Sequence, residues 1–321
     1  METNMETLMP SPQATLTERN IEGIKKLPHA GSPQQARDQL AQRLSLRYRL
    51  GQAKRVLLFV SDGMGLGTQY ATRIWEGQVK GLLGEEHATT LDSAMHVGVT
   101  KTYNLNGQTP DSAATASAFM NGRKTISRVV NTLPILARGQ CNESHNPADY
   151  GIPLFMDMAH KLGFHTGVVS TARLTHATPA SVYAVSSDRI WEYEVPDGCP
   201  QNDIAEQLVA AMEAGRIDVA IGGGWRSFAN KSAGGKRNKG DLLSKMRSAG
   251  VHVTDSRHGF DAISNAPTKA PRVFCAFRDD NNGSHLSYEV DRDASIAPSL
   301  AEMTLTAIRV LSQDEMIKRS L

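Results

Sequence analysis

Apolar residues in this chain follow two patterns that alternate along the sequence. Short, almost continuous apolar runs, such as VLLFV at 56–60, have the length and composition of buried strands. Between these runs, apolar residues recur with helical spacing, for example over 202–214 and 299–311. Strands that alternate with helices indicate βαβ units. We therefore predict an α/β fold with a largely parallel sheet and helices on both faces.

The same patterns predict the individual elements. The predicted strands cover residues 56–60, 95–100, 166–171, 218–221 and 272–277. The predicted helices cover residues 68–78, 113–120, 153–162, 202–214, 242–249 and 299–311. A further helix is predicted over 32–50, where leucines recur with helical spacing. The chain then divides into an N-terminal tail with a lead-in helix, residues 1–51, and one α/β domain, residues 52–321.

Composition argues against several classes of function. The formal net charge of +2 is too small to indicate binding to nucleic acid or to a membrane surface. No apolar segment reaches the roughly 18 residues that a membrane span needs. The first 51 residues contain no basic segment followed by an apolar one, so no secretory signal is predicted. The sequence therefore predicts neither a nucleic-acid partner nor a membrane segment, and it leaves the compartment open.

Candidate chemistry is expected where the predicted strands end, because ligands of parallel sheets bind beyond the carboxyl ends of the strands. The first strand is followed by Ser61, Asp62 and Gly63, which place a carboxylate at that edge. The simpler explanation is a turn capped by the aspartate. A dinucleotide-binding loop is a further alternative, but Thr68 stands where the G-x-G-x-x-G pattern needs its third glycine.

The second candidate is Ser112, which follows Asp111 and precedes a helix rich in small residues. A serine at a helix N-terminus can meet a phosphate, because free N–H groups and the helix dipole favour anions there. A plain helix cap explains the same residues. No Ser-His-Asp arrangement is evident, so a metal ion is the alternative means of activating the hydroxyl.

The third candidate segment follows the predicted strand at 166–171 and contains His176 and Thr178. Thr178 offers a hard oxygen ligand, and His176 could bind a metal or hold a metal-bound water in place. Arg189 comes shortly afterwards, and a guanidinium group can bind two phosphate oxygens. Taken singly, a surface histidine and a solvated arginine explain these residues equally simply.

Several segments, taken in order, carry a family pattern. The most specific are VSDGMG at 60–65, TPDSAATASAFMNGRKT at 109–125 and GVVSTARLTHATPASVYA at 167–184. SSDRIWE at 186–192, IAEQLV at 204–209, DVAIGGG at 218–224, HLSYEVDRD at 285–293 and PSLAEMTLTAIRVLS at 298–312 follow in register. In these segments the chain resembles the alkaline phosphatase family. The resemblance implies that family's α/β fold and the hydrolysis of phosphate monoesters.

The resemblance assigns roles to the residues that match the family's motifs. Ser112 would be the nucleophile that contacts zinc and forms a phosphoserine intermediate. Arg189 would bind the phosphoryl oxygens, and Asp111 would orient Arg189. The substrates would be small phosphate monoesters, and the resemblance is compatible with a homodimer in a periplasmic, extracellular or cell-surface setting.

The same resemblance implies two zinc ions and one magnesium ion as cofactors. Asp62 would bridge one zinc and the magnesium, and Thr178 would be a magnesium ligand. His176 would lie near the magnesium or a third metal, at a position that is Asp in some members of the family and His in others.

The chain has three cysteines, and buried thiols are one explanation of all three. The resemblance places Cys141 and Cys199 where some members of the family have a disulfide. Cys275 would then be left as a free thiol. Spacing alone does not pair them, so both states remain open at this point.

The chain departs from the family pattern after the segment at 298–312. The family normally continues there into a Glu-containing turn and Asp/His clusters that supply most of the zinc ligands. This sequence contains no Asp-His dipeptide and no H-x-x-x-H pattern. We therefore expect a sheet that is incomplete at its C-terminal side and a metal site that lacks part of its ligand set.

Two alternatives to a working phosphatase follow. The chain could be a non-catalytic remnant or a partner-binding protein that keeps the phosphatase fold. A related sulfatase or phosphomutase fits less well, because Ser112 is followed by Ala-Ala-Thr rather than by the sulfatase pattern, and phosphopentomutase-like enzymes use a threonine.

The expected shortage of ligands predicts a measurable outcome. A zinc site needs about three or four protein ligands, so the purified 321-residue chain should hold less than stoichiometric zinc. Its turnover of p-nitrophenyl phosphate should be weak or absent. Metal analysis combined with a phosphatase assay measures both quantities. Stoichiometric zinc together with turnover that Ser112→Ala abolishes would contradict this expectation.

Overall fold

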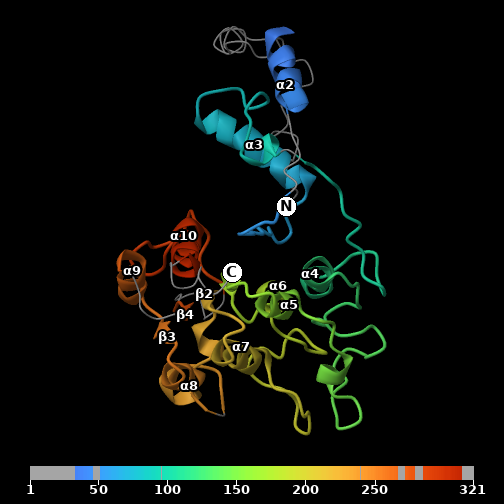
Figure 1. Ribbon diagram of the computed structural model, residues 1–321, viewed down its shortest axis with the longest axis vertical. Helices are drawn as coiled ribbons and strands as arrows, with labels where there is room; N and C mark the ends of the chain where they lie inside the picture. Colours follow the sequence, from blue (N-terminus) through green and yellow to red (C-terminus); the bar gives the residue numbers. More distant parts are fainter. Residues whose placement is uncertain are drawn as a thin grey trace, which may run out of the picture. The chain divides into compact units, whose positions relative to one another are not determined.

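The computed structural model describes residues 33–45, 51–94, 96–238, 240–266, 272–278 and 285–312 (Figure 1). The chain forms two compact units, residues 1–100 and residues 101–321. The domain boundary predicted at residues 51 and 52 stays a prediction.

The unit of residues 1–100 is helical in its described part. It contains α2 (Pro33–Ser45), α3 (Leu66–Val79) and the short 3-10 helix η2 (Leu91–Ser93). The predicted helix at 68–78 is thus confirmed as α3. The predicted lead-in helix is confirmed over residues 33–45, and the remainder of its range lies outside the described residues.

The strands predicted at 56–60 and 95–100 are wrong for the residues that the structure describes. Residues 56–60 and 96–100 are irregular, and Met95 lies outside the described part. Val56 and Phe59 are 71% and 72% exposed. A strand is stable only when another strand pairs with its backbone N–H and C=O groups. The described part of residues 1–100 contains no strand that could do so.

A parallel four-stranded sheet lies at the centre of residues 101–321. Its strands are β1 (Gly167–Arg173), β2 (Val219–Gly223), β3 (His252–Thr254) and β4 (Val273–Ala276), in the order β1-β2-β4-β3. The pairs Val169–Ile221, Ile221–Cys275 and Thr254–Cys275 set the register. The central strands β2 and β4 are buried at every position, which is why they are continuous apolar runs in the sequence.

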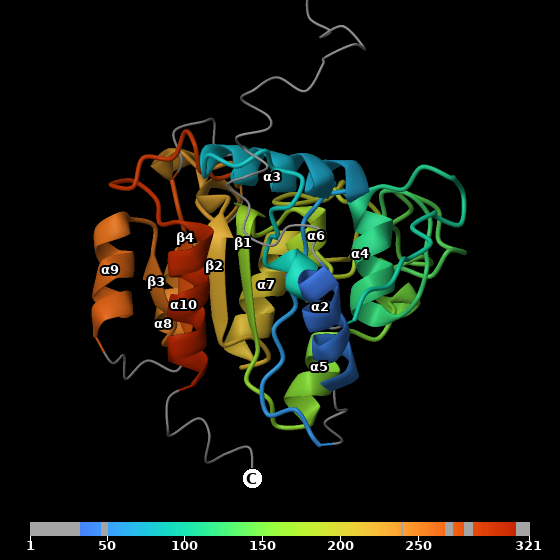
Figure 2. The same ribbon diagram turned by 90° about the horizontal axis from the view of Figure 1, so that it is seen from above.

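Helices connect and cover these strands. They are α4 (Ser112–Asn121), α5 (Phe155–Lys161), α6 (Ala177–Ala180), α7 (Ile204–Glu213), α8 (Leu242–Ser248), α9 (Arg257–Asn265) and α10 (Leu300–Leu311). Figure 2 shows α9 and α10 on one face of the sheet and α7 and α8 on the other. The predicted fold class, a parallel α/β sheet with helices on both faces, is confirmed.

Two apolar cores correspond to the two faces of the sheet. On one face, Leu208 of α7 and Met246 of α8 pack in a cluster with Phe274 of β4. On the other face, Phe260 of α9 and Met303 of α10 pack in a cluster with Val273 and Cys275. Successive residues of a strand point to opposite faces, so neighbouring positions of β4 contribute to different cores. Each core therefore anchors one pair of helices.

Sequence signals set where the longest covering helices begin. α7 begins after Asp203 and α10 begins after Ser299, and each start is a capping box with a glutamate, Glu206 or Glu302. The predicted helices at 113–120, 153–162, 202–214, 242–249 and 299–311 are all present as α4, α5, α7, α8 and α10. β3, α6 and α9 were not predicted. The three residues of β3 and the four of α6 are too few to show a period.

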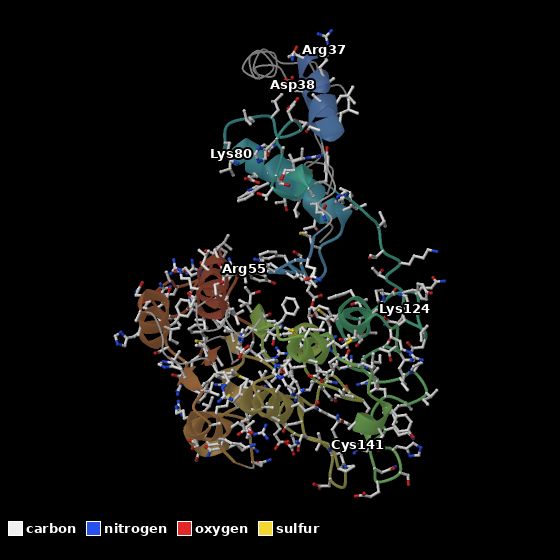
Figure 3. All side chains as sticks on the ribbon, viewed as in Figure 1. Arg37, Asp38, Arg55, Lys80, Lys124 and Cys141 are labelled. Atoms are coloured by element: carbon white, nitrogen blue, oxygen red, sulfur yellow. A yellow bond between two sulfur atoms is a disulfide. The ribbon has the colours of Figure 1, made fainter. Side chains whose placement is uncertain are left out.

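A disulfide joins Cys141 and Cys199, which are 58 residues apart in the sequence (Cys141 is labelled in Figure 3). The pairing that the resemblance implied is therefore present. Cys275 is a free thiol, buried in β4, and burial raises the pKa of that thiol far above its ordinary value. Among the described helices, none is long and apolar enough to cross a bilayer.

Removing the disulfide should destabilise the unit of residues 101–321. Closing a loop of this length restricts the unfolded chain by about 4 kcal/mol in the chain-entropy model. The double variant Cys141→Ala, Cys199→Ala should lose up to that free energy of unfolding in denaturant titration. Dithiothreitol should lower the stability of the parent and leave that of the double variant unchanged. Equal stability of parent and variant would show that the bridge does not form.

Candidate functional site

The N-terminus of α4 is organised by Asp111, which caps the helix. Its carboxylate accepts hydrogen bonds from the backbone N–H groups of Ala113 and Ala114, both at 3.3 Å. The helix therefore begins at Ser112, because these bonds satisfy N–H groups that have no partner within the helix. Gly122 ends the helix in the left-handed conformation, which glycine adopts without strain.

The Asp111 carboxylate has further partners from outside α4. Oδ1 accepts hydrogen bonds from the backbone N–H of Arg128 at 3.0 Å and from Asn104 at 3.3 Å. Oδ2 forms an ion pair with Arg189 Nη1 at 3.1 Å. Burial alone would raise the pKa of Asp111, but the bonds from Arg128, Ala114 and Arg189 outweigh it, so the pKa is lowered. The group is a carboxylate over the whole physiological range.

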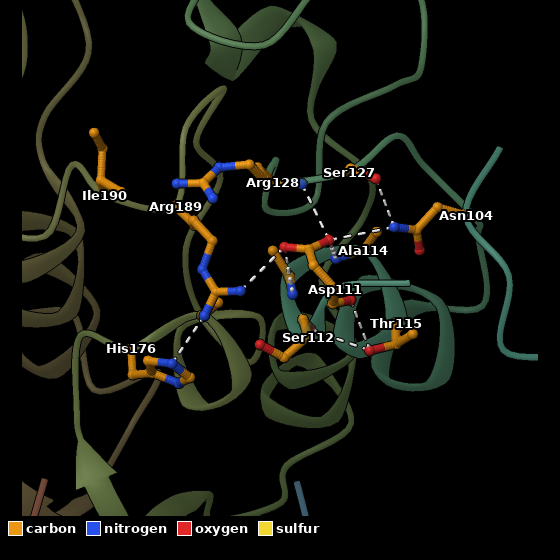
Figure 4. Close-up of polar contacts among 12 residues, drawn as sticks. Asn104, Asp111, Ser112, Ala114, Thr115, Ser127, Arg128, His176, Arg189 and Ile190 are labelled. Carbon is orange, nitrogen blue, oxygen red and sulfur yellow. Dashed lines mark hydrogen bonds and ion pairs between the residues drawn. The ribbon is translucent and has the colours of Figure 1, made fainter. Parts of the chain in front are cut away.

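Arg189 is held from two sides. Its Nη1 binds Asp111, and its Nη2 lies 2.8 Å from Nε2 of His176 (Figure 4). The backbone places it there, because residues Val130 and Ser186 form a two-way bridge and the Arg189 N–H donates to the carbonyl of Arg128. Each side-chain contact uses one N–H of a guanidinium group that has several. The remaining N–H groups can bind an anion.

His176 is neutral in this arrangement. Burial is the main reason, and the positive charge of Arg189 adds to it; together they lower the pKa of His176 to about 4. Because a guanidinium group can only donate, Nε2 of His176 accepts from Arg189, and this assigns the ring proton to Nδ1. Nδ1 is buried and has no hydrogen-bond partner among the described residues. The ring packs edge-on against His285, with 5.0 Å between the ring centroids.

Ser112 lies at the first position of α4 and is partly exposed. Figure 4 shows its hydroxyl on the side of the helix that faces Arg189 and His176. Within the described parts of the chain, the hydroxyl forms no hydrogen bond to a histidine or a carboxylate. No general base for Ser112 is therefore identified there.

Thr178 belongs to α6, which directly follows β1 and packs against α4. His176 is the residue that precedes this short helix. The fold thus brings the segments of Asp111, Ser112, His176, Thr178 and Arg189 to one place in the unit of residues 101–321. Asp62 lies in the other unit, in the turn before α3, and its role as a metal ligand stays a prediction.

The residues of the site fit the expected metals only in part. No group of three His, Cys, Asp or Glu side chains comes together in the described portions of the chain, so no zinc ligand set is identified there. His176, with its proton on Nδ1, presents an N–H rather than a lone pair. It therefore suits a bond to a metal-bound water better than direct ligation.

A second ion pair beside the site was not predicted. Arg173, at the end of β1, donates to both oxygens of Glu192 at 2.8 and 2.7 Å, and Thr175 donates to the same carboxylate at 2.6 Å. Burial alone would raise the pKa of Glu192, but the bond from Arg173 outweighs it and the pKa is lowered. Arg173 and Glu192 both remain charged, and their opposite charges compensate each other. The bidentate geometry joins residues 19 apart and has no signal in the sequence.

Comparison with known proteins identifies the family of the chain. The family model described as alkaline phosphatase matches residues 53–316, which is most of the chain. The chain belongs to the alkaline phosphatase family. Members of this family are metal-dependent hydrolases.

This member of the alkaline phosphatase family is similar in sequence to its relatives over most of its own length. The tissue-nonspecific alkaline phosphatase of Mus musculus is 33% identical in an alignment 306 positions long that covers 88% of this chain and 56% of the mouse protein. The membrane-bound alkaline phosphatase of Bombyx mori is 31% identical over 83% of this chain and 50% of its own length. The chain thus spans about half the length of the curated relatives it matches.

Solved structures of the family share the fold. The alkaline phosphatase of Thermus thermophilus has a TM-score of 0.60 and 26% identity, over 79% of this chain and 46% of its own. The cold-active enzyme of Shewanella sp. has a TM-score of 0.58 and 25% identity, over 80% and 52%.

Replacing Asp111 with asparagine should destabilise the protein at neutral pH and do so less in acid. Asparagine can still cap α4 but loses the ion pair with Arg189, at a cost of about 2 kcal/mol. Because the folded-state pKa is depressed, the carboxylate stabilises the fold above its ordinary pKa of 3.8 and loses this effect as the pH falls through the lower folded value.

Unfolding titrations of the parent and of Asp111→Asn between neutral and acidic pH measure this difference. The gap in the free energy of unfolding should close as the pH falls below 3.8. A gap that stayed constant across the range would show that the negative charge of Asp111 does not matter. Asp149→Asn, at a surface position for which no ion pair is observed, is a matched control and should change stability little.

Proposed function

We propose that this chain carries a phosphate-monoester site in which Ser112 is the nucleophile and passes through a phosphoserine intermediate. Membership of the alkaline phosphatase family supports the reaction class. The observation that carries the assignment to residues is the contact of Arg189 with both Asp111 and His176, beside the N-terminus of the helix that begins with Ser112. That arrangement presents an anion-binding group to a hydroxyl.

In this proposal the protein's own residues bind and orient the phosphoryl group. Arg189 binds its non-bridging oxygens through the N–H groups that Asp111 and His176 leave available. The N-terminus of α4 adds N–H groups and the positive end of the helix dipole. Asp111 and neutral His176 keep the guanidinium in one orientation, so that little conformational entropy is lost when the phosphate binds.

The metal ions of the proposal are two zinc ions and one magnesium ion. Thr178 would hold the magnesium through its hydroxyl oxygen, with His176 donating to a metal-bound water, and Asp62 is proposed as a further metal ligand. A bound divalent ion supplies positive charge that favours the alkoxide form of a hydroxyl. The alternative, a non-catalytic protein that keeps the site, predicts anion binding without phosphate transfer.

Phosphate transfer to Ser112 tests the proposal directly. The full chain, supplied with zinc and magnesium in excess so that a weak metal site is filled, should carry detectable phosphate on Ser112 after incubation with a phosphate monoester and quenching in acid, even where steady-state turnover is weak. Mass spectrometry of the peptide that contains Ser112 detects it. Ser112→Ala should abolish the label. Arg189→Ala should reduce its rate by about a hundredfold or more, because a charge that positions and stabilises the group is lost.

Ser144→Ala is the matched control, because Ser144 is an exposed serine in a surface loop at residues 142–145. It should leave labelling unchanged. If phosphate binds but no label appears on Ser112 at any metal concentration, the non-catalytic alternative holds. If the label appears on another residue, the assignment of Ser112 is wrong.

A further inference from the structure

Arg128 has a backbone conformation that calls for an explanation. Within the described residues, Arg128 and Asn131 are the non-glycine residues with positive φ, at 68° and 53°. This left-handed region is uncommon for a residue with a Cβ atom and costs free energy, whereas glycine adopts it freely. A side-chain interaction that glycine could not make can offset this cost.

The role of Asn131 is structural. Its side chain is fully buried and donates to the carbonyls of Ser181 and Ala184 at 2.8 and 2.7 Å. It also accepts a hydrogen bond from Asn121 at 2.7 Å. These bonds join α4 to the segment that follows α6. Asparagine is moreover one of the residues that tolerate the left-handed region.

No such structural role exists for the side chain of Arg128. It is exposed, and its guanidinium group forms neither a hydrogen bond nor an ion pair with any part of the chain that the structure describes. The contacts of this residue are made by its backbone, which donates to Asp111 and accepts from Arg189. Glycine would keep both contacts and would adopt the same φ without strain.

The guanidinium group of Arg128 lies at the edge of the candidate site. The Arg128 carbonyl accepts the N–H of Arg189 at 2.8 Å, so the two residues are neighbours in space. Figure 4 shows the Arg128 side chain extending toward the segment of Arg189 and Ile190, on the same side of Asp111 as Arg189. Arg189 is partly neutralised by Asp111, whereas Arg128 has no carboxylate against it among the described residues.

We propose that Arg128 binds a second anionic group of the substrate, a carboxylate or a second phosphate close to the ester, and so determines specificity. The inference rests on the proposed function, because it takes Arg189 as the residue that binds the transferred phosphoryl group. A guanidinium group pairs with a carboxylate or phosphate through two parallel N–H bonds. Its N–H groups are available, and the backbone beside it is fixed by Asp111 and Arg189.

A matched pair of ligands tests the proposal. β-Glycerophosphate is a phosphate monoester with uncharged hydroxymethyl groups, and phosphoglycerate with its phosphate on the central carbon replaces one of these groups by a carboxylate. Calorimetric titration of the full chain gives both affinities. All titrations use the Ser112→Ala variant as the starting protein, called the parent in this experiment, and further substitutions are added to it. Zinc and magnesium are present, and without Ser112 no phosphate transfer consumes the ligand.

The carboxylate ligand should bind the parent about tenfold more tightly than β-glycerophosphate does. Tenfold corresponds to the lower end of the free energy that a hydrogen bond to a charged group contributes. Arg128→Gly keeps the backbone conformation and should remove this preference, and Arg128→Lys should restore part of it. Arg123→Ala, which removes an exposed arginine from the same connecting segment, should leave the ratio of affinities unchanged. Thermal unfolding should show Arg128→Gly to be at least as stable as the parent.

The outcomes separate this proposal from the proposed function. Two results would overturn the role of Arg128 alone. The parent could bind both ligands with equal affinity, or Arg128→Gly could lose the same factor of affinity for both. In either case Arg189→Ala must still weaken the binding of β-glycerophosphate. If the parent binds neither ligand, the phosphate site itself is refuted, and both proposals fail together.

Discussion

The carboxylate of Asp111 is the group on which the arrangement of the site depends. It accepts hydrogen bonds from the start of α4, from the backbone of Arg128 and from the guanidinium group of Arg189. These donors belong to three different segments of the chain. A partly buried charge is costly unless such donors surround it. Separating the three segments would leave the carboxylate without partners, and this free-energy cost keeps the segments together. The orientation of Arg189 and the position of Ser112 follow from the same interaction.

The sheet supplies the rigid framework for this network. β1 ends at Arg173 and is followed at once by the segment with His176 and α6, which packs against α4. The bridge between Val130 and Ser186 then holds the Arg128 segment against the Arg189 segment. Residues that lie far apart in sequence therefore converge just beyond the end of a strand, which is where parallel sheets generally bind ligands.

The balance of charge around the site suits an anion. Arg173 is neutralised by the bidentate contact with Glu192, and His176 is neutral because burial and Arg189 disfavour its charged form. Arg189 shares its charge with Asp111, which also receives backbone N–H groups. An anion would therefore meet N–H donors whose positions are already set, and among the described residues the exposed guanidinium group of Arg128 adds a positive charge that no carboxylate compensates.

Local sequence determined much of the fold and the identity of the candidate residues. The buried strands β2 and β4 are continuous apolar runs, α7 and α10 begin at capping boxes, and α4 lies between the capping residues Asp111 and Gly122. The family motifs by themselves pointed to Ser112, His176, Thr178 and Arg189. The run at 56–60 failed as a strand, because pairing depends on a neighbour that local sequence does not specify.

Tertiary structure alone decided how these residues contact one another. The backbone N–H of Arg128, the neutral state of His176 and the pairing of Arg173 with Glu192 depend on distances between segments and on burial. A backbone donor carries no residue signal, and a pKa depends on the surroundings that folding creates. The sequence therefore named the chemical groups of the site, and the packing of α4, α6 and the 128–131 loop decided which of them meet.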